Sequence, residues 1–192
     1  STTAAGSQST LAIPAPAAPS GFTPVSASTT QLNYTWTDSS TNESGFRVLD
    51  GSNNIKVSAA AGAISTSETG LSVNTQYTRK VEAYNATGSA TSGSVSVYTS
   101  IEAAGGGTYE GITETVITAH SSNAPSNLSS GSSGMYFENT TTSSNSGWVK
   151  QNSWTQTGLA TNTAYTFQIT ARNGDGTITS TLSAGSKYTS IE

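Results

Sequence analysis

An internal repeat is the feature of this 192-residue sequence that most constrains its fold. The segment Thr69–Thr78 recurs as Thr157–Thr166 at an offset of 88 residues, and Tyr98–Glu102 recurs as Tyr188–Glu192 at an offset of 90. The larger second offset indicates two extra residues in the last hairpin of the second copy. Copies of roughly 90 residues are too long for solenoid repeats and have the size of a small β-sandwich. We therefore expect two related all-β domains in tandem.

The repeat divides the chain into four regions. Residues 1–18 are small, polar and proline-containing, which favours an extended N-terminal arm or linker. Residues 19–102 form the first domain. Residues 103–110 contain three consecutive glycines and are expected to be a flexible linker. Residues 111–192 form the second domain.

Alternation of apolar and polar residues marks several strands. Leu32, Tyr34 and Trp36 alternate with polar neighbours, which is typical of a half-buried strand. The strand that begins at the repeated tyrosine follows the same rule in both copies. Its residues expected to face the core are Tyr77, Arg79, Val81 and Ala83 in the first copy and Tyr165, Phe167, Ile169 and Ala171 in the second.

These residues resemble a fibronectin type III domain. The family pattern has an early Pro, a Trp on the second strand, a Leu-x-x-x-Thr-x-Tyr turn and a strand that ends Ala-x-Asn-x-x-Gly. In the first copy the matching residues are Pro19, Trp36, Leu71, Thr75, Tyr77, Ala83, Asn85 and Gly88. In the second copy they are Leu159, Thr163, Tyr165, Ala171, Asn173 and Gly176. The second copy lacks the Trp on the second strand, so we expect a modified first sheet there.

The resemblance implies an all-β fold of two tandem fibronectin-III-like, or immunoglobulin-like, antiparallel β-sandwiches. It also implies a structural tyrosine corner in each, at Leu71 and Tyr77 and at Leu159 and Tyr165, where the hydroxyl bonds to nearby backbone. Similar domains occur in tandem in large bacterial surface and secreted proteins, which favours an extracellular location.

Composition narrows the possible functions. The chain has no cysteine, one histidine, 9% charged residues and a net charge of −4, while about a third of its residues are Ser or Thr. With no cysteine there is no disulfide or thiolate metal site, and we expect no cofactor. No basic patch points to nucleic acid, and no apolar run is long enough for membrane insertion. The spaced aromatic residues favour a folded extracellular β protein over a disordered polymer.

Candidate catalytic and metal-binding residues are few. His120 has serine neighbours, but no Gly-x-Ser-x-Gly turn exposes a nucleophile, so we expect a surface histidine and no enzyme activity. Asp38, Glu43 and Asp50 could act as paired carboxylates or bind calcium, and the simpler interpretation is solvated turns beside hairpins.

Three aromatic residues of the second copy, Tyr136, Trp148 and Trp154, could form a platform on which sugar rings stack. The alternative for Trp154 is a core residue that takes the place of the missing second-strand Trp. Five sequons provide possible glycosylation sites at Asn33, Asn42, Asn85, Asn127 and Asn139.

The N-terminal arm is a candidate assembly strand. Leu11 and Ile13 alternate with Ala12, so an extended arm could pair with the sheet edge of a neighbouring copy. The alternative is a linker.

The function predicted from the sequence is a non-catalytic extracellular structural protein in a surface layer, fibre or adhesin. Its expected partners are copies of itself or other surface proteins. The alternative is a spacer or carbohydrate-binding accessory pair of a secreted polysaccharide-degrading enzyme, with polysaccharide as partner.

Overall fold

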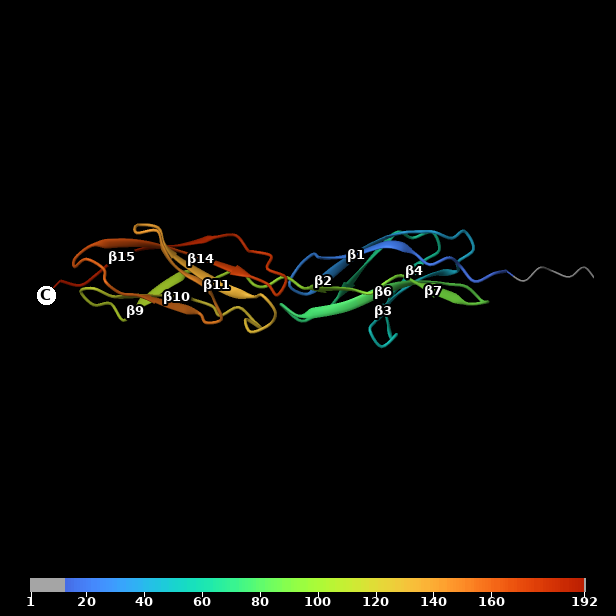
Figure 1. Cartoon of the computed structure of the whole chain (residues 1–192), viewed down its shortest axis with the longest axis horizontal. Coiled ribbons are helices and arrows are strands. Elements are labelled where there is room, and N and C mark those ends of the chain that lie inside the picture. Colours follow the sequence, from blue (N-terminus) through green and yellow to red (C-terminus); the bar gives the residue numbers. More distant parts are fainter. Residues whose placement is uncertain (1–12, 192) are drawn as a thin grey trace, which may run out of the picture. The chain divides into compact units, whose positions relative to one another are not determined.

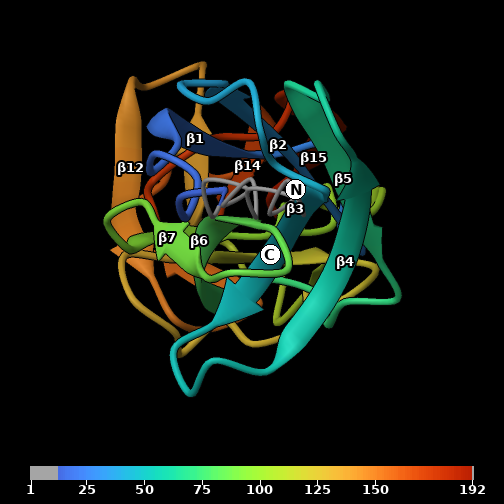
Figure 2. The same cartoon turned by 90° about the vertical axis from the view of Figure 1, so that its right-hand side faces the viewer.

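The computed structural model describes residues 13–191, and these form strands, turns and loops only. The strands of the first sandwich are β1 (Ser20–Ser26), β2 (Gln31–Thr37), β3 (Gly45–Asp50), β4 (Ile55–Ala60), β5 (Ser65–Thr69), β6 (Gln76–Tyr84), β7 (Ser89–Thr91) and β8 (Val95–Tyr98). One sheet has the order β1-β2-β5; the other has the order β4-β3-β6-β7, and β8 also pairs with β6. Figure 1 labels these strands, and Figure 2 shows β1 and β2 in a different layer from β3, β6 and β7.

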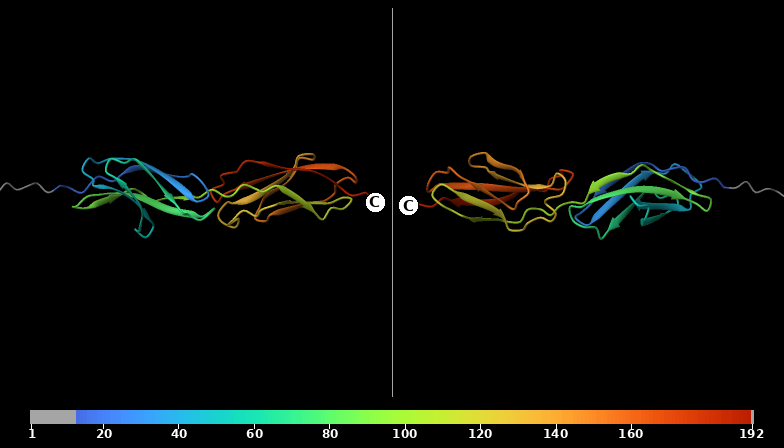
Figure 3. Two further views of the ribbon diagram at one scale, coloured as in Figure 1. Left: turned by 180° about the vertical axis from the view of Figure 1, so that it is seen from behind. Right: turned by 60° about the horizontal axis from the view of Figure 1, so that its bottom comes forward.

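The second sandwich repeats this arrangement. Its strands are β9 (Gly107–Glu110), β10 (Ile117–Ser121), β11 (Gly134–Asn139), β12 (Ser144–Val149), β13 (Ser153–Gln156), β14 (Ala164–Arg172) and β15 (Leu182–Tyr188). They form sheets of order β13-β10-β9 and β12-β11-β14-β15, which Figure 3 shows from two sides. The last part of the sheet differs between the copies: β15 takes the place of β8, and an isolated bridge between Arg172 and Ile178 stands where the first sandwich has the strand β7. The predicted all-β fold of two tandem antiparallel sandwiches is confirmed.

Backbone proximity groups the described residues into two compact units. One contains 13–24, 33–67 and 78–95, and the other contains 25–32, 68–77 and 96–191. This division does not follow the linker expected at 103–110. The last four residues of that segment form β9 and pair with β10, so they belong to the second sandwich and not to a linker. The other domain limits proposed from the sequence stay a prediction. Within the described part of the chain, no helix has the length and hydropathy that crossing a bilayer requires.

The core of the first sandwich contains the residues that the alternation predicted. Tyr34 of β2 is fully buried and stacks on Phe22 of β1, with ring centroids 5.7 Å apart. Trp36 packs on Phe46 of the opposite sheet at 5.3 Å. Contact between large rings from both sheets removes apolar surface from water, which is the main stabilising term for a sandwich of this size.

The core of the second sandwich has the same inward face on its long strand. Phe167 and Ile169 of β14 are fully buried, and Ile117 and Ala119 occupy the inward positions of β10. Trp154 of β13 packs on Phe167 with ring centroids 6.1 Å apart. The aromatic side chain absent from β10 is therefore supplied by the neighbouring strand, as the alternative for Trp154 proposed.

The repeated turn has the same hydrogen bond in both sandwiches. The Tyr77 hydroxyl accepts a hydrogen bond from the Ser72 amide at 2.8 Å, and the Tyr165 hydroxyl accepts one from the Ala160 amide at 2.8 Å. The glycine before the repeated leucine has a left-handed backbone in both copies, with φ of 75° at Gly70 and 71° in its counterpart. Glycine is the residue that takes this conformation without steric cost, which explains why it recurs.

A threonine from the second repeated motif fixes this turn in each sandwich. Thr99 donates its hydroxyl proton to the Ser72 carbonyl at 2.7 Å and accepts a hydrogen bond from the Thr75 amide at 3.1 Å. Thr189 makes the equivalent bonds to the Ala160 carbonyl at 2.7 Å and the Thr163 amide at 3.0 Å. Both threonines are buried. The two blocks of the sequence repeat are therefore in direct contact within each sandwich.

Replacing either corner tyrosine with phenylalanine tests the corner. Tyr77→Phe and Tyr165→Phe should each lower the free energy of unfolding by about 1–3 kcal/mol, because a backbone amide loses its acceptor. Thermal and urea unfolding measure this. Tyr188→Phe is the matched control, since Tyr188 is 61% exposed, and it should leave stability unchanged. Equal melting of all three variants and the parent chain would contradict the structural role of the corners.

Tyr109 joins the two sheets of the second sandwich at their edge. Its hydroxyl donates to the carbonyl oxygens of Gly185 at 2.8 Å and Ala184 at 3.0 Å, and its ring lies 5.7 Å from that of Phe167. Burial raises the pKa of Tyr109 to about 12, because the phenolate would lose hydration. The neutral phenol is therefore the form that the folded chain favours.

This raised pKa predicts a loss of stability in alkali. The contribution of Tyr109 should be complete below pH 10, its ordinary pKa, and should decline as the pH rises from about 10 toward 12. Melting curves of the parent chain and Tyr109→Phe between pH 8 and about 11.5 isolate this residue from the other tyrosines. The difference in melting temperature between the parent chain and Tyr109→Phe should shrink as the pH rises. Parallel curves would show that Tyr109 is not responsible.

Candidate functional site

An aromatic cavity on the second sandwich is the leading candidate for a binding site. It lies on the outer face of the β12-β11-β14-β15 sheet. In β11, Met135 and Phe137 are fully buried in the core, so Tyr136 and Glu138 point to the opposite face. The cavity has a volume of about 310 Å³ and is lined by Tyr136, Glu138, Trp148, Gln168, Thr170, Ile178 and Thr181.

Strand register brings the two large rings together. Tyr136 lies opposite Trp148 of β12 on one side and opposite Thr170 of β14 on the other. The ring centroids of Tyr136 and Trp148 are 5.3 Å apart, with planes inclined at 47°. The β11–β12 pairing is interrupted by a bulge just beyond Tyr136, and Gly147 before the tryptophan has φ of 63°. Bulges redirect side chains, and here one adjoins the aromatic pair.

The surroundings of the cavity hold these rings in place. The Arg172 guanidinium lies over the Trp148 ring, 4.3 Å from its centroid, which is a cation–π contact. Thr170 and Thr181 share a hydrogen bond of 2.9 Å across β14 and the segment before β15. Ile178 forms an exposed apolar edge. This arrangement presents aromatic and aliphatic surface beside polar side chains, a combination suited to binding.

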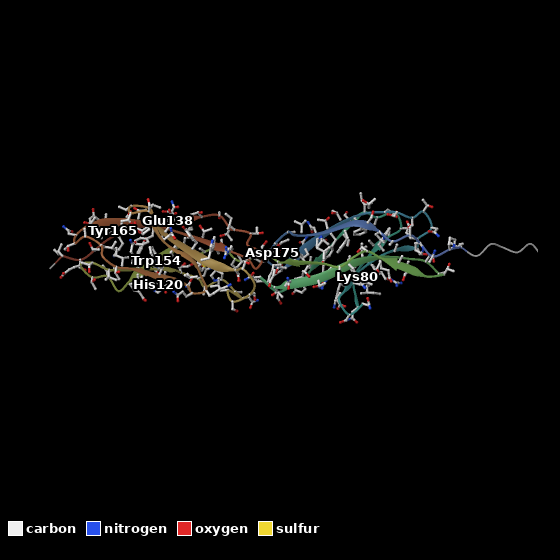
Figure 4. The ribbon with its side chains drawn as sticks, viewed as in Figure 1. Lys80, His120, Glu138, Trp154, Tyr165 and Asp175 are labelled. Atoms are coloured by element: carbon white, nitrogen blue, oxygen red, sulfur yellow. The ribbon has the colours of Figure 1, made fainter. Side chains whose placement is uncertain are left out.

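Trp154 does not join this pair, so the predicted three-ring platform is corrected to two rings. Trp154 belongs to the other sheet and packs on the core, while Tyr136 and Trp148 lie on the outer face. Figure 4 labels Trp154 and Glu138 on different strands of the second sandwich. Alternation in β13 could not distinguish these locations, because both faces of a short strand carry polar neighbours.

His120 lies beside a carboxylate on the outer face of the other sheet. Its Nε2 atom lies 2.7 Å from Oε1 of Glu110 on the neighbouring strand β9. No serine hydroxyl is recorded within hydrogen-bonding distance of this imidazole in residues 13–191. The contact is therefore a cross-strand pair between β10 and β9, and a histidine without a catalytic role stays a prediction.

The three carboxylates of the first sandwich each have local partners. Asp38 accepts a hydrogen bond from the Ser40 amide, and Glu43 accepts bonds from the Ser40 hydroxyl and the Gly62 amide. The Ser40 hydroxyl is the main cause that lowers the pKa of Glu43 below its ordinary range. Across residues 13–191, no three acidic or histidine side chains gather as a metal ion would require.

Asp50 organises the β3–β4 hairpin. It accepts hydrogen bonds from the Asn54 side chain and amide and from the Ser52 amide, and it pairs with Lys56 at 3.0 Å. The pKa of Asp50 is lowered well below its ordinary range, chiefly by the Asn54 side chain, then by the Asn54 amide and by Lys56. The carboxylate oxygens of Asp50 accept hydrogen bonds within the turn, which agrees with the simpler interpretation of a turn residue beside a hairpin.

The described end of the N-terminal arm contacts the first sandwich. Ile13 belongs to no strand, and its carbonyl oxygen accepts a hydrogen bond from the Thr87 hydroxyl at 2.6 Å. The Pro14 carbonyl accepts bonds from the side-chain amides of Asn42 and Asn85, both at 2.8 Å. We call Asn42, Asn85 and Thr87 the asparagine clamp. Leu11, the other residue of the proposed assembly strand, lies outside the described residues.

An open hollow of about 610 Å³ adjoins this arm. Its walls are Ile13, Pro14, Ala15, Ala17 and residues 39–42. It is larger than the aromatic cavity, but it offers no aromatic ring and no charged side chain to a ligand. The aromatic cavity is therefore the stronger candidate.

The five sequon asparagines have different surroundings. Asn33 and Asn127 are exposed, and Asn42 and Asn85 belong to the asparagine clamp. Asn139 is fully buried, and its side-chain nitrogen donates to Gln156 at 2.8 Å. The folded sandwich has no room for a glycan at Asn139, while glycosylation of the other four stays a prediction.

Sequence reasoning did not identify several residues of the cavity. Glu138 and Gln168 lie opposite each other on β11 and β14, and Arg172 reaches Trp148 from two strands away. Because these residues alternate with core residues along their strands, the sequence could have indicated that their side chains lie on the outer face of the sheet. The strand neighbours that complete the cavity depend on register, which alternation alone does not define.

Comparison with solved structures gives the fold of the chain. It is similar to a two fibronectin type-III domain segment from chicken tenascin, with a TM-score of 0.58, 16% sequence identity and coverage of 89% of this chain and 99% of that one. Further matches are chicken CNTN1 FN1–FN3 domains (TM-score 0.39, 19% identity, coverage 93% and 69%) and the central fibronectin-III array of RIM-binding protein (TM-score 0.37, 13% identity, coverage 94% and 70%). No protein-family model and no curated protein sequence matches the chain. The tenascin match confirms the predicted fold: two sandwiches with the fibronectin type III fold in tandem.

The local pairing of His120 and of the acidic residues predicts independence from metal ions. Treatment with a chelator should leave the melting temperature unchanged, because a metal held only by the folded state would stabilise it by mass action. His120→Ala should change the free energy of unfolding by less than about 1 kcal/mol, as expected for a pair whose carboxylate partner is 70% exposed. Differential scanning calorimetry with and without chelator measures both. A lower melting temperature with chelator would reveal an oxygen-ligand site.

Proposed function

We propose that this tandem pair is a non-catalytic extracellular structural protein, working in a surface layer, fibre or adhesin, with copies of itself or other surface proteins as partners. Support comes from the open edge of the first sandwich. Strand β4 ends its sheet, and its Ile55 side chain is 53% exposed. Its one charged residue, Lys56, is paired with Asp50. An edge strand with little free charge can accept a strand from another chain.

The low charge of the whole chain favours the same function. With 9% charged residues and a net charge of −4, identical surfaces repel one another weakly. Val25 on β1, the edge of the other sheet, is also an exposed apolar side chain. Both sheets of the first sandwich therefore offer an apolar residue at an edge.

A charge on β4 tests this proposal. The full chain should assemble as its concentration rises, and Ile55→Lys should raise the required concentration at least tenfold, because a lysine on an edge opposes strand pairing. Ile64→Lys is the matched control, since Ile64 is at least as exposed as Ile55 but belongs to no strand. Sedimentation velocity and electron microscopy measure assembly. A chain that stays monomeric at millimolar concentration contradicts the proposal.

Deleting residues 1–13 tests the arm separately. Loss of assembly in this variant would support the arm as the added strand. Assembly equal to that of the full chain would leave the arm as a linker and assign the contact to the sheet edges.

The aromatic cavity supports a second candidate function, a spacer or carbohydrate-binding accessory pair of a secreted polysaccharide-degrading enzyme. Tyr136 and Trp148 provide the stacking surface that sugar recognition uses. Retention on insoluble polysaccharide without self-assembly would favour this candidate over the first.

A further inference from the structure

We propose that the cavity on β11, β12 and β14 is a subsite for a neutral hexopyranose unit of a polysaccharide. This inference deepens the second candidate function and rests on it. It assigns a ligand class to the cavity and a role to each of its walls.

The apolar wall matches the C–H face of a sugar ring. The Tyr136 and Trp148 rings are 5.3 Å apart and inclined at 47°, so they present two joined planes instead of one flat surface. Ile178 adds an exposed aliphatic side. Aromatic faces carry partial negative charge that attracts the weakly positive C–H groups of a pyranose. The volume of about 310 Å³ is at the lower end of ligand cavities, and it suits a small ligand such as a single ring.

The polar wall has unused hydrogen-bonding capacity. Glu138 and Gln168 lie opposite each other on β11 and β14, and both line the cavity. Neither side chain makes a hydrogen bond or ion pair with another residue in 13–191. A carboxylate accepts hydrogen bonds, while an amide both accepts and donates. Adjacent hydroxyl groups of a hexose can satisfy both side chains together.

The charges favour a neutral sugar over an acidic one. Glu138 lies in the cavity wall, and its carboxylate would repel the carboxylate of a uronic acid. The nearby cation, Arg172, is engaged over the Trp148 ring and does not line the cavity. Arg172 is thus a positioning residue that fixes the plane of the tryptophan.

Binding measurements with defined oligosaccharides test the assignment. The full chain is titrated with hexamers of β-1,4-linked glucose and of β-1,4-linked mannose, and with a galacturonate hexamer, by calorimetry and two-dimensional NMR. At least one neutral hexamer should bind, and its shifted amide signals should fall in β11, β12 and β14. Trp148→Ala should weaken this binding at least tenfold, because the stacking surface is lost.

Two further variants complete the design. Glu138→Gln keeps the shape but removes the charge, so it should weaken neutral binding severalfold and reduce the discrimination against galacturonate. Tyr188→Ala, which removes an exposed aromatic side chain outside the cavity, should bind like the parent. Melting curves test whether each variant is folded. Sedimentation tests whether Trp148→Ala has the same state of assembly as the parent chain, which is the expected result.

The possible outcomes distinguish a failure of the neutral-sugar assignment from a failure of the carbohydrate-binding function. Binding of galacturonate alone would overturn the neutral-sugar assignment and retain the carbohydrate-binding function. Absence of binding to all three hexamers at millimolar concentration would overturn both. A lysine-rich peptide is titrated as a fourth ligand, and its binding in place of the sugars would identify the cavity as a site for cationic side chains and would also overturn the proposal. If Trp148→Ala bound the sugar as tightly as the parent chain, the binding site would lie outside this cavity and the proposal would be overturned.

Discussion

The hydrogen bonds between the repeated turn and the threonine that follows the last strand are the interaction on which each sandwich depends. Thr99 in one copy and Thr189 in the other bond to both a carbonyl and an amide of the turn that carries the corner tyrosine. This links the end of one sheet to the connection between the two sheets. Only a third of the chain is hydrophobic, so its cores are small, and the polar groups buried at their ends have to be hydrogen-bonded.

The long strand pair β11–β14 shows how one register builds both the core and the candidate site. Met135 and Phe137 face inward, while the residues between and beyond them face outward, since side chains alternate along a strand. A register slip of one residue would exchange the two sets and bury Glu138. Stability of the core therefore also secures the composition of the cavity.

Much of the fold could be predicted because the repeat and the alternation are local signals. The inward face of β14 and the role of the two corner tyrosines could be predicted from the residues next to them in the sequence. The Thr99 contact joins residues 27 positions apart, and one threonine among so many hydroxyl side chains gives no signal of its own. The pairing of Tyr136 with Trp148, and the separation of Trp154 from them, depend on which strands are neighbours in space. Burial of Asn139 likewise follows from the fold and not from its sequon.

The asparagine clamp has a chemical consequence for two of the sequons. N-linked sugar is attached to the side-chain nitrogen of asparagine, and in Asn42 and Asn85 this nitrogen is the atom that holds the Pro14 carbonyl. A substituted amide nitrogen keeps only one of its two hydrogens and carries a bulky group where the proline segment lies. Sugar attachment and a docked arm thus compete for the same two atoms. The occupancy of these sequons would record whether the arm was docked when the chain met the glycosylating enzyme.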